Sequence, residues 1–378
     1  MAAKPTVGAD LLGASRLALE AVTGVTELVE AVHMHVLDKA IGTPLIRPVA
    51  GVTSLVYRSV KGATRLVGGG LDAVLGRLAP ALANPADWTG REALVAALNG
   101  VLGDRLAASG NPLAMPMHLR VAGAAGARIA VLAHGLCMND LQWLRDGHDH
   151  GALLARERGY TPVYLRYNSG RHIAENGYEL AAQLQDLVDG WPVPVEELII
   201  VAHSMGGLVA RSACHAAQQG GQSWPGLLSK MVFLGTPHHG APLERGGNWV
   251  HLLIDKSAYS APFSRLGKIR SAGITDLRHG SVLGADHDRF AHGVPLPEVP
   301  PLPPGVRCFA IAATNGQREG DWKDTLLAGD GLVPVASALG QHPDPARCLP
   351  LEPVVLYQTN HMQLLSSPQV GDQLLAWL

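Results

Sequence analysis

The stretch covering residues 196–211 constrains the fold more than any other part of the chain. It contains the apolar run 198–202 (LIIVA), which predicts a strand buried on both faces. The run ends just before Ser204, and a helical pattern begins after the next two glycines. A serine at a sharp turn between a strand and a helix has strained backbone dihedrals and closely approaching neighbours. Small residues are needed two positions before and after it, and Ala202 and Gly206 stand there.

The residues around Ser204 read A-H-S-M-G-G. This run resembles the serine motif of Bacillus-type lipases and of their wider bacterial esterase/lipase family, which includes GPI inositol-deacylase-like proteins. Ala202 departs from the G-x-S-x-G pattern but agrees with the Bacillus-type variant. The resemblance covers residues 115–378. It implies an α/β-hydrolase fold, a mostly parallel sheet with helices on both faces, in which the serine occupies the nucleophile elbow.

A nucleophilic serine needs a base, and the base needs a carboxylate to orient it. In this fold the chain order is serine, acid, histidine, and the last two follow late strands. His361 directly follows a predicted strand at 353–357, and its Asn-His pair resembles the catalytic histidine segment of Pseudomonas- and Burkholderia-type lipases. We therefore expect His361 to be the base. His342, in a proline-rich loop before that strand, is the alternative.

The candidate acid is Asp330, in the run G-D-G-L-V-P after a predicted strand at 306–312. The D-G-L-V segment resembles the catalytic acid segment of the same lipases, although an Asp-Gly pair also suits an ordinary turn. Other aspartates lie nearby in the sequence. The alternatives are Asp321 and Asp324, with Asp286 and Asp288 earlier in the chain.

Two backbone N–H groups should stabilise the oxyanion of the tetrahedral intermediate. Met205, the residue after the nucleophile, is expected to supply one. The H-G pair after the strand at 128–134 resembles the oxyanion loop of these lipases, which implies Leu136 as the second donor. The run T-P-H-H-G at 236–240 resembles the wall beside the nucleophile in esterases and lipases. Residues expected to contact the substrate are His134, Gly135, His203, Pro237 and His238.

Two histidine clusters have the residue types of metal ligands but not the spacing. Neither the segment 148–150 (HDH) nor the pair at 238–239 matches a helical HExxH or a Cys/His zinc site. In the Pseudomonas-type lipases an aspartate two residues after the catalytic histidine helps to bind calcium, and Gln363 stands there in this chain. We therefore expect no metal and no cofactor.

Charge and cysteine usage narrow the class of protein. The formal net charge of −2 and the isoelectric point near 6.8 give no electrostatic basis for binding nucleic acid. The four cysteines form no CxxC pair, so free thiols are expected, with a Cys308–Cys348 disulfide as the alternative in a secreted protein. Charged residues interrupt the N-terminal apolar stretch, and no apolar run reaches the about 18 residues of a spanning helix. We expect a cytoplasmic protein, with a position at the periphery of a membrane as the alternative.

The first 110 residues form a predicted helical extension, and residues 111–378 form the catalytic domain. The extension carries an acidic helical stripe at 8–40 and a basic one at 51–79. A helical hairpin packed on the catalytic domain explains these faces, and two alternatives are a basic surface lying on anionic lipid and a dimer contact. A third helix is expected to begin at a capping box at Thr89 and to run to about residue 107. Residues 241–294, irregular and glycine-rich, are the predicted lid or cap.

The remaining pattern alternates strands with helices, as in a doubly wound sheet. Helices are expected at 176–189 and 367–378 and directly after Ser204. Strands are expected at 117–121, 128–134, 162–166, 197–203, 230–235, 306–312 and 353–357.

The expected function is that of a serine hydrolase of the carboxylesterase or triacylglycerol-lipase type, with a catalytic triad and an oxyanion hole. The partner is a small-molecule or lipid ester, and the resemblance implies that it is hydrophobic. The same residues would also serve a polyester depolymerase, a thioesterase or an acyltransferase. In a different class, the N-terminal helices could be the function of a membrane-binding or scaffolding protein whose hydrolase site is degenerate.

Overall fold

The structure is a computed structural model that describes residues 12–13, 16, 91–241, 271–283, 299–319 and 328–378. The predicted N-terminal stripes, the capping residue Thr89 and most of the predicted lid lie outside the described residues. So do the four alternative aspartates at 286, 288, 321 and 324. The chain divides into two compact units, one of residues 1–91 and 108–114 and one of residues 92–107 and 115–378.

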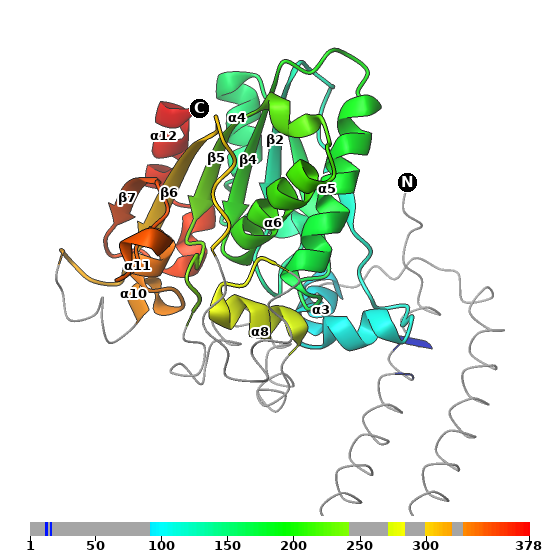
Figure 1. Ribbon diagram of the computed structural model, residues 1–378, viewed down its shortest axis with the longest axis horizontal. Helices are drawn as coiled ribbons and strands as arrows, with labels where there is room; N and C mark the ends of the chain where they lie inside the picture. Colours follow the sequence, from blue (N-terminus) through cyan, green and yellow to red (C-terminus); the bar gives the residue numbers. More distant parts are fainter. Residues whose placement is uncertain (1–11, 14–15, 17–90, 242–270, 284–298, 320–327) are drawn as a thin grey trace, which may run out of the picture. The chain divides into compact units, whose positions relative to one another are not determined.

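The second unit is built on a seven-stranded sheet with the strand order β1-β3-β2-β4-β5-β6-β7 (Figure 1). β1 pairs with β3 antiparallel, and every other neighbouring pair is parallel. The strands are β1 His118–Val121, β2 Arg128–Ala133, β3 Thr161–Arg166, β4 Glu197–His203, β5 Leu228–Leu234, β6 Arg307–Ala313 and β7 Glu352–Leu356. The predicted mostly parallel α/β sheet is confirmed.

Helices cover both faces of the sheet, with α5 and α6 on one face and α4 and α12 on the other (Figure 1). The α-helices are α3 Arg91–Ala108, α4 His150–Arg158, α5 Ile173–Asp189, α6 Met205–Gln219, α8 Ala272–His279, α10 Ala328–Gly331, α11 Val335–Ala338 and α12 Pro368–Trp377. The short 3-10 helices are η1 Asp140–Trp143, η2 Trp224–Leu227, η5 Pro345–Arg347 and η6 His361–Leu365. Because both faces are covered, the central strands read as continuous apolar runs.

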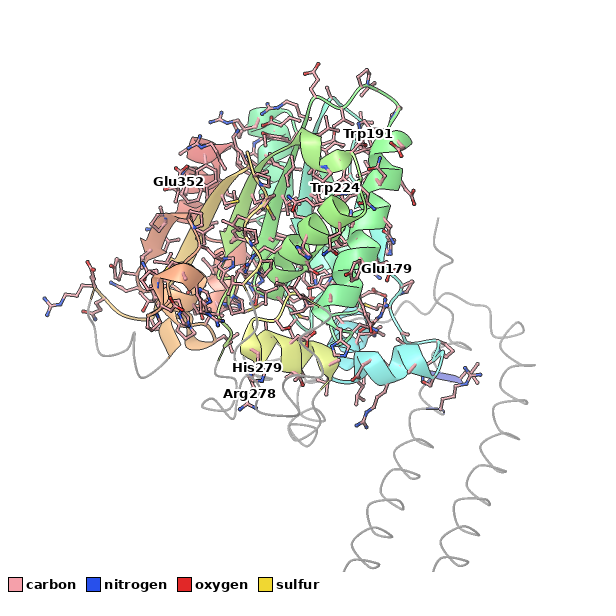
Figure 2. The ribbon with its side chains drawn as sticks, viewed as in Figure 1. Glu179, Trp191, Trp224, Arg278, His279 and Glu352 are labelled. Carbon is pink, nitrogen blue, oxygen red and sulfur yellow. The ribbon has the colours of Figure 1, made fainter. Side chains whose placement is uncertain are left out.

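Burial follows this layering. The β2 and β4 side chains are buried apart from the first residue of each strand, whereas the edge strand β7 is only half-buried to exposed. Trp224 is fully buried near the amino end of β5, and Glu352 points outward from β7 (Figure 2). Among the described residues, no helix combines the length and apolar character needed to cross a bilayer. All four cysteines are free thiols, and only Cys348 is exposed.

Helix α3 belongs with the sheet and not with the N-terminal unit. The side chain of Asn99 accepts a hydrogen bond from the Met115 N–H at 2.8 Å. Gly100 lies against Cys137 so closely that a Cβ atom at position 100 would be 2.2 Å from the Cys137 sulfur. The predicted domain boundary at residue 110 therefore differs from this division of the chain.

The register of the parallel strands brings their carboxyl ends to one edge. Ala133 of β2 pairs with Ala202, and His203 of β4 pairs with Leu234 of β5. Leu234 in turn pairs with Ile311 of β6. Loops that are far apart in the sequence therefore begin side by side, which is where this topology places its functional groups.

Candidate active site

Ser204 occupies a strained turn between β4 and α6. Its dihedrals are φ 54° and ψ −125°, which a non-glycine residue adopts only when the surrounding structure imposes them. The Ser204 N–H donates to the Leu234 carbonyl at 2.8 Å, so the turn is held by the neighbouring strand. The side chain is almost wholly buried, at 4% exposure. This geometry matches the sharp strand-to-helix turn predicted at Ser204.

The small residues after Ser204 are required by close backbone contacts. A Cβ atom at Gly206 would lie 2.5 Å from the carbonyl oxygens of both Ala133 and His134. A Cβ atom at Gly207 would lie 2.1 Å from the Thr236 hydroxyl oxygen. No side chain fits at either position without movement of the backbone or of Thr236. The two glycines therefore allow α6 to start directly against the ends of β2 and β5.

Asp330 and His361 form a buried hydrogen-bonded pair. The His361 Nδ1 atom lies 2.6 Å from the Asp330 Oδ2 atom, and both side chains are at most 3% exposed. The other carboxylate oxygen, Oδ1, accepts hydrogen bonds from the N–H groups of Leu332 at 2.9 Å and Val333 at 2.8 Å. These bonds fix the carboxylate, and the carboxylate in turn fixes the orientation of the imidazole ring.

Contacts with the turn around Ser204 place the Asp330–His361 pair at the same edge of the sheet as Ser204. The His203 Nε2 atom donates to the His361 carbonyl at 3.1 Å, and the two rings lie 4.7 Å apart. A Cβ atom at Gly235, the residue after β5, would lie 3.1 Å from His361 Cε1. The His361 Nε2 atom is buried and makes no hydrogen bond within the described part of the chain.

The loop after β2 passes directly over the serine. A Cβ atom at Gly135 would lie 3.0 Å from Ser204 Cβ and from His203 Nδ1. Leu136 follows it and is fully buried, as is Met205 in the first turn of α6, where backbone N–H groups lack intrahelical partners. The Cys137 N–H, by contrast, donates to the Ser169 hydroxyl at 3.1 Å.

Three buried histidines surround this centre, and burial is the main cause of the low pKa of each. Desolvation lowers the pKa of His134, which stacks on Tyr167 at 4.3 Å, to about 4. Burial also holds the pKa of His203 well below its usual range, with the charge of His361 adding to the effect. The pKa of His238 is likewise well below its usual range, because of burial and the neighbouring Arg211.

The alternative base, His342, is in a different environment. Its ring lies 5.0 Å from the ring of His239, and its Nδ1 atom accepts from the Asp344 N–H at 3.0 Å. Among the described residues, no carboxylate forms an ion pair with His342. The histidines of the 148–150 segment bind each other, because His148 Nε2 lies 2.9 Å from His150 Nδ1. His150 Nε2 also donates to the Leu364 carbonyl at 2.9 Å.

Two further buried residues, Arg211 and Tyr167, contact the histidines of this site and are not predicted from the sequence. The buried Arg211 side chain lies 3.3 Å from His238 Nδ1 and donates to the Pro300 carbonyl at 2.9 Å. Burial lowers the pKa of this arginine to about 10. The sequence signal for Arg211 is that it is the one charged residue in a helix of mostly small and apolar residues. Tyr167, whose hydroxyl donates to the His134 carbonyl at 2.9 Å, carried no comparable signal.

Residues 174–302, about a third of the chain, match the family model described as the PGAP1-like alpha/beta domain. No curated protein matches the chain. Among solved structures, the mature lipase BlEst2 of Bacillus licheniformis is 19% identical, with a TM-score of 0.43, over 69% of this chain and 98% of that one. An esterase of Pyrobaculum calidifontis is 16% identical, with a TM-score of 0.43, over 69% and 78% of the two chains. A type II thioesterase of yersiniabactin biosynthesis is 15% identical, with a TM-score of 0.37, over 68% and 94%.

Proposed function

We propose that this chain, which has the α/β-hydrolase fold, is a serine carboxylic-ester hydrolase that works through an acyl-enzyme. One observation carries the proposal. A buried carboxylate, Asp330, is bonded to His361 at 2.6 Å, and His361 packs against the strained turn that presents Ser204. A hydroxyl, an imidazole and a carboxylate at one sheet edge are the groups that nucleophilic acyl transfer needs.

In the first half of the reaction, the Ser204 oxygen attacks the carbonyl carbon of the ester. The hydroxyl proton passes to Nε2 of His361, the ring nitrogen that Asp330 does not engage. Asp330 keeps Nδ1 protonated, holds the ring in place and stabilises the imidazolium. The carbonyl oxygen becomes an oxyanion, which the N–H groups of Met205 and Leu136 stabilise.

Collapse of this intermediate breaks the bond between the carbonyl carbon and the alcohol oxygen. His361 returns the proton to the departing alcohol, and Ser204 keeps the acyl group. Water then attacks the acyl-enzyme while His361 accepts its proton, and a second collapse releases the carboxylic acid and restores the Ser204 hydroxyl. The same residues would act on thioesters or polyesters, and relative rates on matched oxygen esters, thioesters and polymer substrates distinguish these activities.

Replacement of the nucleophile tests the proposal directly. We expect Ser204→Ala to reduce kcat for short p-nitrophenyl esters by at least about 10³-fold and to abolish labelling by a fluorophosphonate, because no other group accepts the acyl chain. The matched control is Ser229→Ala, which changes a serine near the amino end of β5 that bonds to Glu197. Circular dichroism checks that both variants are folded. Undiminished turnover by a folded Ser204→Ala protein would overturn the assignment of the nucleophile.

A further inference from the structure

The loop after β2, which contains the proposed oxyanion donor Leu136, is bonded on both sides of that residue to the loop after β3. On the amino side, the Tyr167 hydroxyl donates to the His134 carbonyl at 2.9 Å. On the carboxyl side, the Cys137 N–H donates to the Ser169 hydroxyl at 3.1 Å. The two residues between these bonds are therefore held in place by one neighbouring loop.

The Leu136 N–H is close to the proposed nucleophile. A Cβ atom at Gly135 would lie 3.0 Å from the Ser204 Cβ atom. Three covalent bonds separate that Cβ position from the Leu136 nitrogen, so this nitrogen lies within about 7 Å of Ser204 Cβ. Among the described residues the Leu136 N–H has no hydrogen-bond acceptor, whereas the next N–H, that of Cys137, is bonded to Ser169. Of these two N–H groups, the one of Leu136 is available to a ligand.

Cys137 has a strained backbone conformation directly after this donor. Its φ angle is 60°, in the left-handed region that favours glycine. A residue with a side chain remains there only where the surrounding contacts impose it. Loss of those contacts would let φ become negative. That rotation would reorient the segment that carries the Leu136 N–H relative to the rest of the loop.

Helix α3 supplies part of the contact around Cys137. A Cβ atom at Gly100 would lie 2.2 Å from the Cys137 sulfur, 2.9 Å from its Cα atom and 3.0 Å from its nitrogen. The Cys137 thiol also lies 3.9 Å from the Ala97 carbonyl, to which it donates weakly. Two residues further on, the Asn139 side chain donates to the Glu92 carbonyl at 3.1 Å. The loop after β2 is therefore packed on α3 at Cys137 and at Asn139.

The loop that carries Ser169 is fixed by the same helix. The Asn168 side chain donates to the Gly103 carbonyl at 2.9 Å and accepts from the Gly170 N–H at 3.1 Å. A Cβ atom at Gly170 would lie 2.1 Å from the Asn99 carbonyl oxygen, so the two backbones are in direct contact. Ser169 stands between these two anchored residues in the sequence and is fully buried. Its hydroxyl is therefore fixed independently of any substrate.

We propose that Ser169 is a positioning residue of the oxyanion hole. By accepting the Cys137 N–H, it keeps the turn at Cys137 in its strained form and keeps the Leu136 N–H directed at the reacting carbonyl. Ser169 acts through the Cys137 backbone and touches no reacting atom. The inference rests on the proposed ester hydrolysis, because only a reaction with an oxyanion intermediate needs this donor. A preorganised donor stabilises the oxyanion more than the uncharged carbonyl of the bound ester, so its displacement should lower kcat and not substrate affinity.

Ser169→Ala removes the acceptor of the Cys137 N–H. We expect kcat for short p-nitrophenyl esters to fall by at least about tenfold, with KM changed by less than about twofold. The fall should be smaller than the about 10²–10³-fold loss that follows deletion of an oxyanion donor, because the Leu136 N–H is displaced and not removed. Ser169→Thr keeps a hydroxyl acceptor, and its kcat should stay within about threefold of that of the parent protein.

Two inhibitors with the same acyl chain distinguish a positioning role from a general loss of packing. The carbonyl carbon of a trifluoromethyl ketone takes the Ser204 oxygen and forms a hemiketal oxyanion, whereas the corresponding ether binds without reaction. In Ser169→Ala we expect the inhibition constant of the ketone to rise by at least about tenfold and that of the ether by less than about twofold. Only the ketone adduct uses the oxyanion donors, so a general loss of packing would weaken both inhibitors alike.

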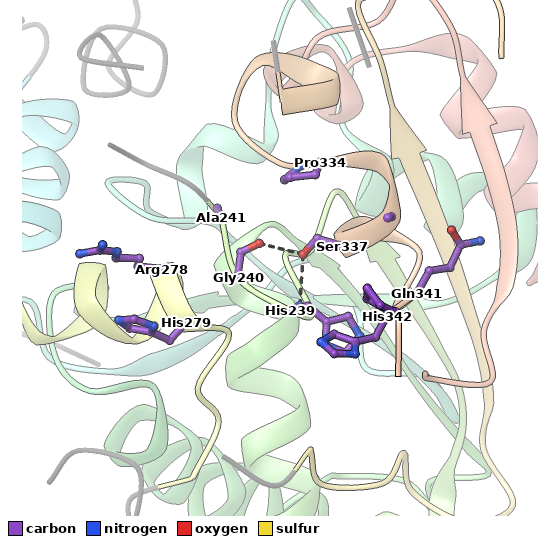
Figure 3. Close-up of a pocket in the computed structure, with 11 residues that line it drawn as sticks. His239, Gly240, Ala241, Arg278, His279, Pro334, Ser337, Gln341 and His342 are labelled. Atoms are coloured by element: carbon purple, nitrogen blue, oxygen red, sulfur yellow. Dashed lines mark hydrogen bonds between the residues drawn. The ribbon is translucent and has the colours of Figure 1, made fainter. Parts of the chain in front are cut away.

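Ser337 provides a matched control. Its hydroxyl accepts the His239 N–H at 3.1 Å and donates to the Gly240 carbonyl at 2.8 Å (Figure 3). Ser337 is also buried, but these bonds join the loop after β5 to helix α11 and not the loop that carries Leu136. We expect Ser337→Ala to lower Tm about as much as Ser169→Ala does and to leave the ratio of the two inhibition constants unchanged.

Gly100→Ala tests the same turn from α3, and it keeps the inference testable if Ser169→Ala does not fold. The added methyl group would meet the Cys137 sulfur and backbone, so Cys137 must shift. We expect the same selective weakening of the ketone in this variant. Gly226→Ala is its control, because no atom lies within 4 Å of a Cβ position there.

The outcomes separate the inference from the proposed function. Selective weakening of the ketone in Ser169→Ala or Gly100→Ala, with Ser169→Thr close to the parent protein, supports the inference. Equal weakening of both inhibitors, or an unchanged kcat in folded Ser169→Ala, overturns it and leaves ester hydrolysis by Ser204 standing. A parent protein that hydrolyses no ester and takes no fluorophosphonate label would overturn the proposed function, and the inference with it.

Discussion

Two buried histidines lead us to expect that the free energy of unfolding of this protein falls in acid. His150 is wholly buried between its bonds to His148 and to the Leu364 carbonyl. Burial lowers its pKa to about 4, and the pKa of His134 is also about 4. In the unfolded chain each would titrate near its ordinary pKa of about 6.5. The unfolded state therefore binds more protons than the folded state between these values, so stability falls as the pH falls through this window.

We expect the free energy of unfolding to drop by about 2 kcal/mol per such histidine between about pH 7 and about pH 5. His150→Gln removes one of these groups, so its stability should depend less steeply on pH over that range, although its stability at about pH 7 is also lower. Urea unfolding at a series of pH values measures both quantities. His215→Gln is the matched control, and it should retain the parent slope. If the free energy of unfolding of His150→Gln changes with pH as steeply as that of the parent protein, His150 does not cause this pH dependence.

At the residue level, much of the candidate site could be anticipated from short motifs in chain order. The runs around Ser204, Asp330 and His361 each lie after a strand, and parallel strands share one edge. The bond from His203 to the His361 carbonyl could not be anticipated, because it joins residues 158 positions apart and depends on where a loop ends. The same holds for Arg211, whose partners come from two distant loops.

At the scale of elements, helix α8 is the described part of the predicted lid, and its anchoring is specific. Asp276 accepts a hydrogen bond from the Ile173 N–H at 2.9 Å at the amino end of α5, and its Oδ2 atom lies 3.0 Å from His172 Nδ1. Its Gly273 contacts Met205, since a Cβ atom there would lie 3.0 Å from the Met205 Cε atom. α8 therefore covers the start of α6.

Asp276→Ala should lower the free energy of unfolding by about 2 kcal/mol, because it leaves a buried N–H of α5 without its acceptor. The hydrogen bond to Asp276 raises the pKa of His172 above its ordinary value. The contribution of this contact to the free energy of unfolding is therefore fully present below about pH 6.5. It is lost as the pH rises through the raised pKa of His172. Amide hydrogen exchange across residues 271–283 should be faster at about pH 8 than the intrinsic pH effect explains.

Asp276→Asn separates these contributions, because it keeps an acceptor for Ile173 but removes the charge that His172 needs. In this variant the additional pH dependence of exchange should disappear. If exchange across α8 in Asp276→Ala equals that of the parent protein, Asp276 does not anchor the helix.

Element boundaries show where sequence patterns are less informative. The strand predicted at 230–235 begins at Leu228, because Leu228 pairs with Leu198 before a register shift at which β5 has one extra residue. A shift of this kind depends on the neighbouring strand and leaves no periodic signature. The short helix α10 was not predicted. It consists of Ala328–Gly331 around the candidate acid and includes Gly329 at φ 60°, a local bend that hydrophobic periodicity does not encode.

At the scale of the whole molecule, the contacts of α3 determine where the unit that contains the sheet begins. The Ser271 hydroxyl donates to the Gly100 carbonyl at 2.7 Å, and the Ala272 N–H donates to Asp104 at 3.0 Å. Gly100 also packs on Cys137, the residue next to Leu136 in the loop over the serine. The sequence predicts a domain boundary at residue 110, because a glycine and a proline there are typical of a linker. Only tertiary contacts assign α3 to the sheet.

Two truncated proteins test this assignment. Residues 91–378 retain α3, and we expect them to hydrolyse short esters with kcat/KM within about threefold of the full chain. Residues 111–378 lack α3, and we expect a loss of at least about tenfold together with a lower Tm, since the loops carrying Ser271 and Cys137 lose their support. Thermal unfolding measures the Tm of each protein, and hydrolysis of short esters measures its kcat/KM. Equal activity of the two proteins would mean that α3 is dispensable.

The bond from the Ser204 N–H to the Leu234 carbonyl holds the turn at residue 204, and the absence of side chains at 206 and 207 makes room for it. None of these contacts uses the hydroxyl group. Deleting that one oxygen atom should therefore convert the catalyst into a receptor of unchanged shape, able to retain an intact ester. Identifying the compound that such a protein binds from a natural mixture would identify its natural substrate.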